Sequence, residues 1–249
     1  GYNLGQSGNT PSQNLVDAYE MIDGTPFDWN NPEHKSNPYA NRDPRLAMSI
    51  LTNNVEFKDR TIEAWTGGRD GKGVIHATRT GYYIYKFIDP NLDLLQNRTS
   101  VHHWVIMRYA EILLSYAEAM NEAYGPTGNV GYRLNAVRAL NQVRNRVGVE
   151  MPAVPTAISK EELREKIRNE RRVELAFEDH RFWDVRRWMI APETLGAPLR
   201  GVEITKISDE EFEYNPIEVE KRTFEPKMYL YSIPQADLNT TGWVQNPLW

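Results

Sequence analysis

Residues 105–126 read VIMRYAEILLSYAEAMNEAYGP, and this stretch decides the fold class. Apolar and small side chains recur in it every three or four residues, which is the spacing of one buried helix face. Gly125 and Pro126 follow, and a helix ends there because glycine favours the left-handed cap and proline cannot continue the helix. The expected buried face carries Tyr109, Ile112, Leu113, Tyr116, Ala117 and Met120.

A second helix is predicted directly downstream, in YRLNAVRALNQVRNRVG at residues 132–148, with Gly148 as its terminator. Small residues on both helices favour an antiparallel hairpin of the tetratricopeptide type. One such hairpin cannot bury its own apolar face, so we expect it to stack on further helices, including an array upstream of Gly1. The apolar face of the second helix carries Leu134, Val137, Leu140, Val143 and Val147. The alanines near the seam are Ala110, Ala117, Ala136 and Ala139.

A third helix is predicted to begin at Ser159, because Ser159 and Glu162 form an S-x-x-E capping box. It continues through LREKIRNERRVELAFED at residues 163–179, and a further helix is expected in HRFWDVRRWMI at 180–190. Three glutamates of the third helix are spaced four residues apart and so share one face. They are Glu170, Glu174 and Glu178.

These glutamates admit two interpretations. Paired carboxylates can hydrolyse glycosidic bonds, but the reaction needs two carboxylates across a cleft, and these three project from one helix. Arginines are interleaved with them, so we favour a structural ion-pair network that ties helices together, and we assign no catalytic residue. The arginines are Arg171, Arg181, Arg186 and Arg187.

The segments on either side of the helices are rich in turn residues. Residues 1–104 hold many Gly, Pro, Asn and Asp residues, which predicts long ordered loops with a few short β-hairpins. Tyr83, Tyr85 and Phe87 alternate as on one face of a strand. Residues 191–249 are expected to form loops and then an extended tail packed over the helices. The predicted fold is therefore mainly α.

Composition excludes several classes of function. The chain has 249 residues and a net charge of -5, which argues against a nucleic-acid partner, and it has no apolar run long enough to span a membrane. It has no cysteine, which excludes disulfides, thiolate zinc sites and thiol catalysis. Its five histidines, among them the adjacent His102 and His103, show no metal-ligand spacing. We expect neither a metal nor a cofactor.

Five motifs appear in order across nearly the whole chain. They are PSQNLVDAYEMIDGTPF with NRDPRL at 11–27 and 41–46, RYAEILLSYAEAMNE at 108–122, LNQVRNRVG at 140–148, ERRVELAFEDHRFWDVRRW at 170–188 and YLYSIPQADLNTTGWVQNPLW at 229–249. In this order they resemble the C-terminal half of SusD/RagB-type proteins. Two positions depart from that pattern, since Asp179 and Leu248 stand where the family has glycine. We interpret both as local backbone adjustments, because Asp tolerates left-handed conformations.

The resemblance implies a SusD-like fold with tetratricopeptide-like hairpins, in which residues 1–104 form a loop-rich ligand face, 105–190 a helical core and 191–249 a closing segment. It also implies a lipoprotein on the surface of the outer membrane that captures oligosaccharides, or sometimes peptides, and passes them to a TonB-dependent, SusC-like transporter. The lipid anchor, the signal peptide and the N-terminal half would lie upstream of Gly1.

The candidate carbohydrate-binding residues are Trp65, Arg69, Asp70 and Trp29. Trp65 precedes the glycine-rich run GGRDGKG, where a backbone can approach a ligand closely. Its indole can stack on a sugar ring while Arg69 and Asp70 bond hydroxyl groups, or it can simply anchor the loop base. Trp104, Trp183 and Trp188 are expected in the core. A protein-binding scaffold and a glycoside hydrolase remain as alternative functions.

Overall fold

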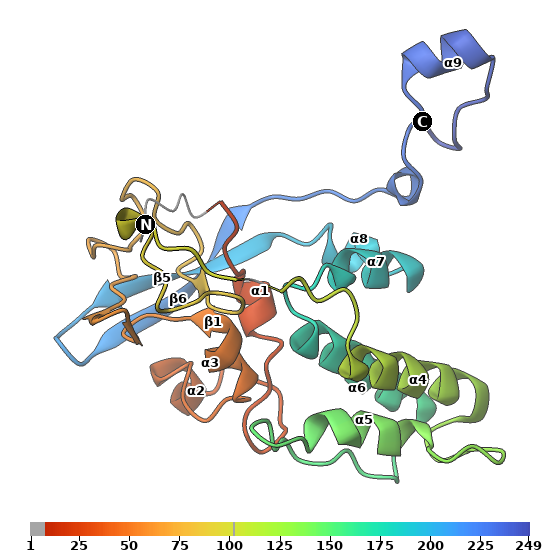
Figure 1. The fold of residues 1–249 in the computed structure, drawn as a ribbon, viewed down its shortest axis with the longest axis horizontal. Coiled ribbons are helices and arrows are strands. Elements are labelled where there is room, and N and C mark those ends of the chain that lie inside the picture. Colours follow the sequence, from red (N-terminus) through yellow and green to blue (C-terminus); the bar gives the residue numbers. More distant parts are fainter. Residues whose placement is uncertain (1–7, 102) are drawn as a thin grey trace.

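The structure is a computed structural model that describes residues 8–101 and 103–249. Figure 1 shows the longer helices gathered at one end of the body and a long β-hairpin with three short helices at the other, and the fold is mainly α with few strands, as predicted. The long helices are α4 (Tyr109–Tyr124), α5 (Ala136–Arg144), α6 (Lys160–Glu174) and α7 (His180–Arg187). The short ones are α1 (Gln13–Val16), α2 (Pro32–Ser36), α3 (Arg45–Ser49), α8 (Ala191–Thr194) and α9 (Gln235–Thr241), with 3₁₀ turns η2 (Leu94–Gln96) and η3 (Pro226–Tyr229).

Helices α4 and α5 form the expected hairpin, and α6 packs against α4. Leu114, Leu140 and Leu163, one from each helix, are fully buried in the cluster between them. The predicted ends of two helices are confirmed. The capping box of Ser159 and Glu162 starts α6, and Gly125 ends α4 with a φ of 74°.

The second helix of the hairpin is shorter than predicted. It begins after Asn135, whose side chain accepts a hydrogen bond from the Arg138 amide, and it ends at Arg144 rather than Gly148. Arg144 turns inward and pairs with Glu20 and Glu170 at 2.9 and 2.8 Å. Val147 lies beyond the helix and is 94% exposed, so its expected place on the buried face is wrong.

The face of α4 is also less covered than its periodicity suggests. Tyr109 is 69% exposed and Ile112 is 48% exposed, although both were expected in the buried face. Leu113 and Ala117 are buried in the α4–α5–α6 cluster as expected, together with Leu114, which was not predicted. In the described residues, neither α5 nor α6 covers the part of α4 that carries these exposed side chains. The expectation that further helices stack on this hairpin therefore stays a prediction.

The loop-rich half contains two short antiparallel pairs, as expected. Strands β1 (Ile50–Leu51) and β4 (Tyr83–Ile84) pair with Ile50 opposite Ile84, and β2 (Glu56–Phe57) pairs with β3 (Arg60–Thr61). The strand predicted through Phe87 stops at Ile84, and Phe87 itself has a φ of 70°. A strand cannot continue through that left-handed conformation.

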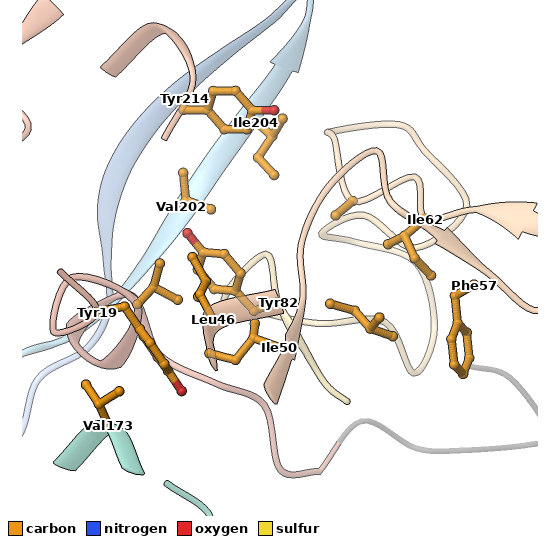
Figure 2. Close-up of a cluster of buried hydrophobic side chains, with 13 residues drawn as sticks. Tyr19, Leu46, Ile50, Phe57, Ile62, Tyr82, Val173, Val202, Ile204 and Tyr214 are labelled. Atoms are coloured by element: carbon orange, nitrogen blue, oxygen red, sulfur yellow. The ribbon is translucent and has the colours of Figure 1, made fainter. Parts of the chain in front are cut away.

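The longest strands lie where loops were predicted. Strands β5 (Leu199–Lys206) and β6 (Phe212–Glu220) pair in register, with Ile204 opposite Tyr214. Val202, Ile204 and Tyr214 face a core that they share with Tyr19 and Val173, as Figure 2 shows. The β5–β6 hairpin therefore packs both on the N-terminal segment, at Tyr19, and on α6, at Val173. The alternation of apolar and charged residues that is typical of strands is short here, and Gly201 and Pro216 interrupt it, so the hairpin was not recognised from the sequence.

The tail packs on α7 and α8 only through its first part, around Tyr229, so the expectation is wrong for the segment beyond Tyr231. Figure 1 shows α9 standing away from the body at the end of an extended segment. Hydrogen bonds within the tail close it on itself; for example, the Asn246 side chain donates to the Tyr231 carbonyl at 2.6 Å. Trp243 and Val244 are 63% and 89% exposed.

Candidate functional site

The glycine-rich loop after Trp65 is tightly built. The Thr66 amide donates to the Ile204 carbonyl at 2.8 Å, which ties the loop base to β5. A Cβ on Gly71 would lie 1.9 Å from the Trp65 carbonyl oxygen, so this position accepts only glycine without rearrangement. The loop is therefore an ordered platform on the hairpin rather than a flexible excursion.

The Trp65 indole lies on the rim of the core. It is half-buried, and its ring packs on Phe212 of β6 with centroids 5.4 Å apart. The Lys206 ammonium group lies 5.0 Å from the centroid of the indole. Trp65 thus anchors the loop and keeps part of its ring accessible, which combines the two interpretations made from the sequence. Phe212 and Lys206 were not identified from the sequence, because their hairpin was not recognised.

Asp70 and Arg69 occupy different environments. Arg60 donates to both oxygens of the buried Asp70 carboxylate, at 2.6 Å each, and the Glu63 amide donates to one of them. Burial acts to raise the pKa of Asp70, but the hydrogen bonds from Arg60 and Glu63 outweigh it and lower the pKa. Asp70 therefore supports the loop and offers no free carboxylate to a sugar. Arg69 is exposed and pairs with Glu63.

Trp29 lies on the same core cluster as Trp65 but makes separate contacts. Its indole N–H donates to Asp17 Oδ1 at 3.0 Å, and Phe27 packs edge-on with centroids 5.0 Å apart. The ring is half-buried. No described ring contact joins Trp29 to Trp65, so the structure does not bring these two candidates together directly.

Two tryptophans expected in the core are at the surface. Trp104 and Trp183 are 75% and 61% exposed, and both line a cavity of about 310 Å³ together with Phe87 and His180. Only Asp184 and Val185 of α7 are buried, so the short helix turns Trp183 outward. Trp188 is half-buried, and its indole N–H donates to Glu118. The Trp104–Trp183 cavity is a second aromatic surface suited to a sugar ring.

All three glutamates are in ion pairs, but α6 ends at Glu174, so Glu178 lies beyond the helix on which it was predicted. Glu174 is completely buried and accepts hydrogen bonds from Arg45 and Arg108 at 2.9 and 2.5 Å, and it also pairs with Arg146. Burial acts to raise the pKa of Glu174, but the bonds from Arg108 and Arg45 outweigh it and lower the pKa to about 2. A carboxylate held ionised in this way is a poor general acid.

The other two glutamates complete the network. Glu170 pairs with Arg45 and Arg144, and Glu178 pairs with Lys86 and Arg108. These cations come from the loops and from the ends of the α4–α5 hairpin, so the network ties both halves of the fold to α6.

The cations predicted for this network lie elsewhere. Arg171 pairs with Asp184 at 2.9 Å, and Arg187 pairs with Glu118 and Asp184. Arg186 donates to the Tyr229 carbonyl, and Arg181 lines a cavity beside α1. The ion-pair network expected on α6 exists, but the interleaved arginines are not its partners, because neighbours in sequence on a helix point in different directions.

The described residues, 8–101 and 103–249, contain neither a cluster of metal ligands nor a helix that could span a membrane. No group of three or more ligating side chains that could hold a metal ion is found there, and His102 lies outside this part of the chain. None of the described helices combines the length and the apolar character needed to cross a membrane.

Comparison with known proteins settles the relationship. The model of the family described as the SusD family matches residues 1–249. The chain belongs to the SusD family. Two SusD-like proteins of Formosa agariphila, P2 and P38, are 34% and 35% identical to it over 120 and 104 residues. These matches cover 46% and 39% of the chain, but only 22% and 19% of the relatives.

Solved SusD-like structures share the fold. A SusD-like protein from Bacteroides fragilis matches with a TM-score of 0.80 and 32% identity, over 98% of this chain and 48% of that one. A SusD-like carbohydrate binding protein from the same species matches with a TM-score of 0.74 and 31% identity, over 92% and 47%. This SusD-family chain therefore spans about half the length of these relatives.

Proposed function

We propose that this chain is part of a non-catalytic protein that binds oligosaccharides at the surface of the outer membrane and delivers them to a TonB-dependent, SusC-like transporter. A lipid anchor upstream of Gly1 would hold it at the membrane. The SusD-family match over residues 1–249 carries this proposal, and it is supported by a structural relative described as carbohydrate binding.

The aromatic loop supplies the physical basis for glycan binding. An indole at the core rim can cover the apolar face of a pyranose, and burial of some tens of Å² contributes about 1–2 kcal/mol. Millimolar sugar binding amounts to only about 4 kcal/mol in total, so one stacking contact is a large share of it. Arg69 stands exposed on the same loop as a donor for sugar hydroxyl groups.

The test compares three tryptophan variants of the full-length protein on a glycan array and in affinity gels. Trp65→Ala is expected to weaken glycan binding about tenfold without unfolding the protein, since it removes one stacking contact. Trp29→Ala, in the same core cluster, is expected to have a smaller effect. Trp183→Ala is the matched control at a separate aromatic surface. If only Trp183→Ala reduces binding, the site is the Trp104–Trp183 cavity instead.

The same preparation separates the two alternative functions. A glycoside hydrolase would release new reducing ends from polysaccharides, and loss of that turnover in Glu174→Gln or Glu178→Gln would contradict the proposal. The ion pairs at both carboxylates support the absence of such turnover. A protein-binding scaffold would bind no glycan on the array while retaining a protein partner, which would also contradict it.

A further inference from the structure

A cavity of about 560 Å³ lies between α1, the end of α6, α7, α8 and β5. Neither Trp65 nor Trp29 lines it. Arginine dominates its charged lining, which includes four guanidinium groups and two carboxylates. The arginines are Arg172, Arg181, Arg200 and Arg222, and the acids are Asp17 and Glu193. Segments from both ends of the chain meet around it, as the positions of α1 and α8 in Figure 1 indicate.

Two of these arginines already have carboxylate partners. Arg200 pairs with Asp17 Oδ2 at 2.9 Å, and Arg222 pairs with Glu220 at 3.1 Å. The other oxygen of Asp17 accepts from Gln13 at 2.7 Å and from the Trp29 indole at 3.0 Å. Asp17 therefore has little capacity left to neutralise further cations in the cavity.

The other two arginines have no carboxylate within 4.0 Å among residues 8–101 and 103–249. Arg172 donates to the Asn14 carbonyl, which is uncharged. Burial, followed by the charge of Arg172, lowers the pKa of Arg181 to about 10. Two like charges that are partly removed from water lower their energy when an anion binds between them.

We propose that this cavity binds the anionic substituent of an acidic saccharide, a carboxylate or a sulfate, with Arg181 and Arg172 as its charged contacts. The geometry suits such a ligand, because apolar side chains of Leu15, Phe177 and Leu195 line the same cavity and can face a sugar ring. The saccharide part of this inference rests on the proposed glycan-binding function, whereas the preference for negative charge rests on the arginines alone.

The test is calorimetric titration of the full-length protein with four ligands. Trigalacturonate and its methyl ester share the same sugar chain, but the ester lacks the negative charges. A sulfated galactose trimer replaces the carboxylate by sulfate, and sodium sulfate lacks the sugar. Arg181→Gln is expected to weaken binding of the acidic trimers about tenfold, because it removes a charge-assisted hydrogen bond. Arg181→Lys should retain most of the affinity. Arg138→Gln on α5 is the control, since it removes the same charge from an exposed position.

The acidic trimer that binds more tightly identifies the substituent. Equal binding of trigalacturonate, its methyl ester and the sulfated trimer, or an unchanged affinity in Arg181→Gln, would overturn the inference while leaving the Trp65-dependent binding intact. Sodium sulfate binding as tightly as the trimers would overturn the saccharide assignment. Failure of every ligand to bind, with neutral glycans still retained on the array, would mean that another part of the protein fills the cavity, and would overturn the inference as well.

Discussion

At the scale of single residues, the motif NRDPRL places two arginines with different tasks. Arg42 donates to the Pro38, Val16 and Tyr19 carbonyls, so it replaces the backbone hydrogen bonds that these loops lack. Arg45 instead reaches α6 and neutralises Glu170 and Glu174. The short motif therefore holds the loops together and attaches them to the helices.

Glu174→Ala tests the buried network. Removal of one buried partner leaves Arg45 and Arg108 without their shared carboxylate, and such a loss costs about 3–5 kcal/mol of unfolding free energy. Glu122→Ala is the matched control, because Glu122 pairs with Arg164 at the surface and an exposed pair contributes less than about 1 kcal/mol. Urea unfolding measures both variants. Equal losses of unfolding free energy in the two variants would show that the buried network stabilises the fold no more than an exposed ion pair does.

The same carboxylate predicts an acid response. The pKa of Glu174 falls from 4.5 to about 2 on folding, so the unfolded chain binds the proton more readily than the folded one. Its contribution to stability is therefore complete above about pH 4.5 and disappears as the pH falls towards about 2. In Glu174→Gln, the unfolding free energy should depend less on pH between about pH 5 and pH 3. Glu210→Gln, at the exposed β5–β6 turn, should keep the parental slope.

At the scale of elements, the Trp65 loop depends on one glycine. Gly71→Ala forces a Cβ against the Trp65 carbonyl and should displace the loop, which would change the tryptophan fluorescence and lower glycan affinity about as much as Trp65→Ala does. Gly8→Ala is the control, because a Cβ there meets nothing within 4 Å. Unchanged fluorescence and affinity in Gly71→Ala would refute the view that the loop is a rigid platform.

The helices were predictable and the hairpin was not, for physical reasons. Capping at Ser159 and termination at Gly125 are local in sequence, so their positions follow from a few residues. The strands β5 and β6 acquire their buried face only by packing on α1 and the loop core, which lie more than a hundred residues upstream.

The same distinction applies to the candidate site, where features set by neighbouring residues were predictable and contacts between distant segments were not. A tryptophan beside a glycine run is a local signal, and it located the loop correctly. The partners of Asp70 and the surface position of Trp183 depend on contacts with other elements, such as the bidentate pair with Arg60. Asp179 and Leu248 do adopt left-handed φ values, of 62° and 71°, so the two departures from the family pattern are backbone adjustments as predicted.

At the scale of the whole molecule, the tail is attached to the body mainly around Arg186. The guanidinium group lies 5.0 Å from the Phe182 centroid, 5.6 Å from Phe224 and 5.3 Å from Tyr231, and it donates to the Tyr229 carbonyl. Cation–π contacts of this kind contribute about 0.5–1 kcal/mol each at exposed sites. This cluster holds residues 224–231 against α7. Helix α9 lies beyond these residues and takes no part in the cluster.

Arg186→Ala should loosen that attachment. Limited chymotrypsin digestion of the full-length protein is expected to release the tail several-fold faster, since the loss of two or more such contacts corresponds to about 1–2 kcal/mol. Lys227→Ala provides the control, because Lys227 contacts only Glu225 and Trp249 within the tail itself. Equal digestion rates of the parent and Arg186→Ala would show that the tail is held elsewhere.

The contact between α1 and β5 bears on how the protein is made. Arg200 donates its amide to the Asn14 side chain, and Asn14 in turn donates to the Pro198 carbonyl. A ribosome adds about 5–20 residues per second, so α1 emerges roughly ten to forty seconds before the strand that completes its core. During that interval Tyr19 and Ile50 have no partner surface from the β5–β6 hairpin. The apolar side chains of the first half that belong to this core therefore stay uncovered until the β5–β6 hairpin has been synthesised.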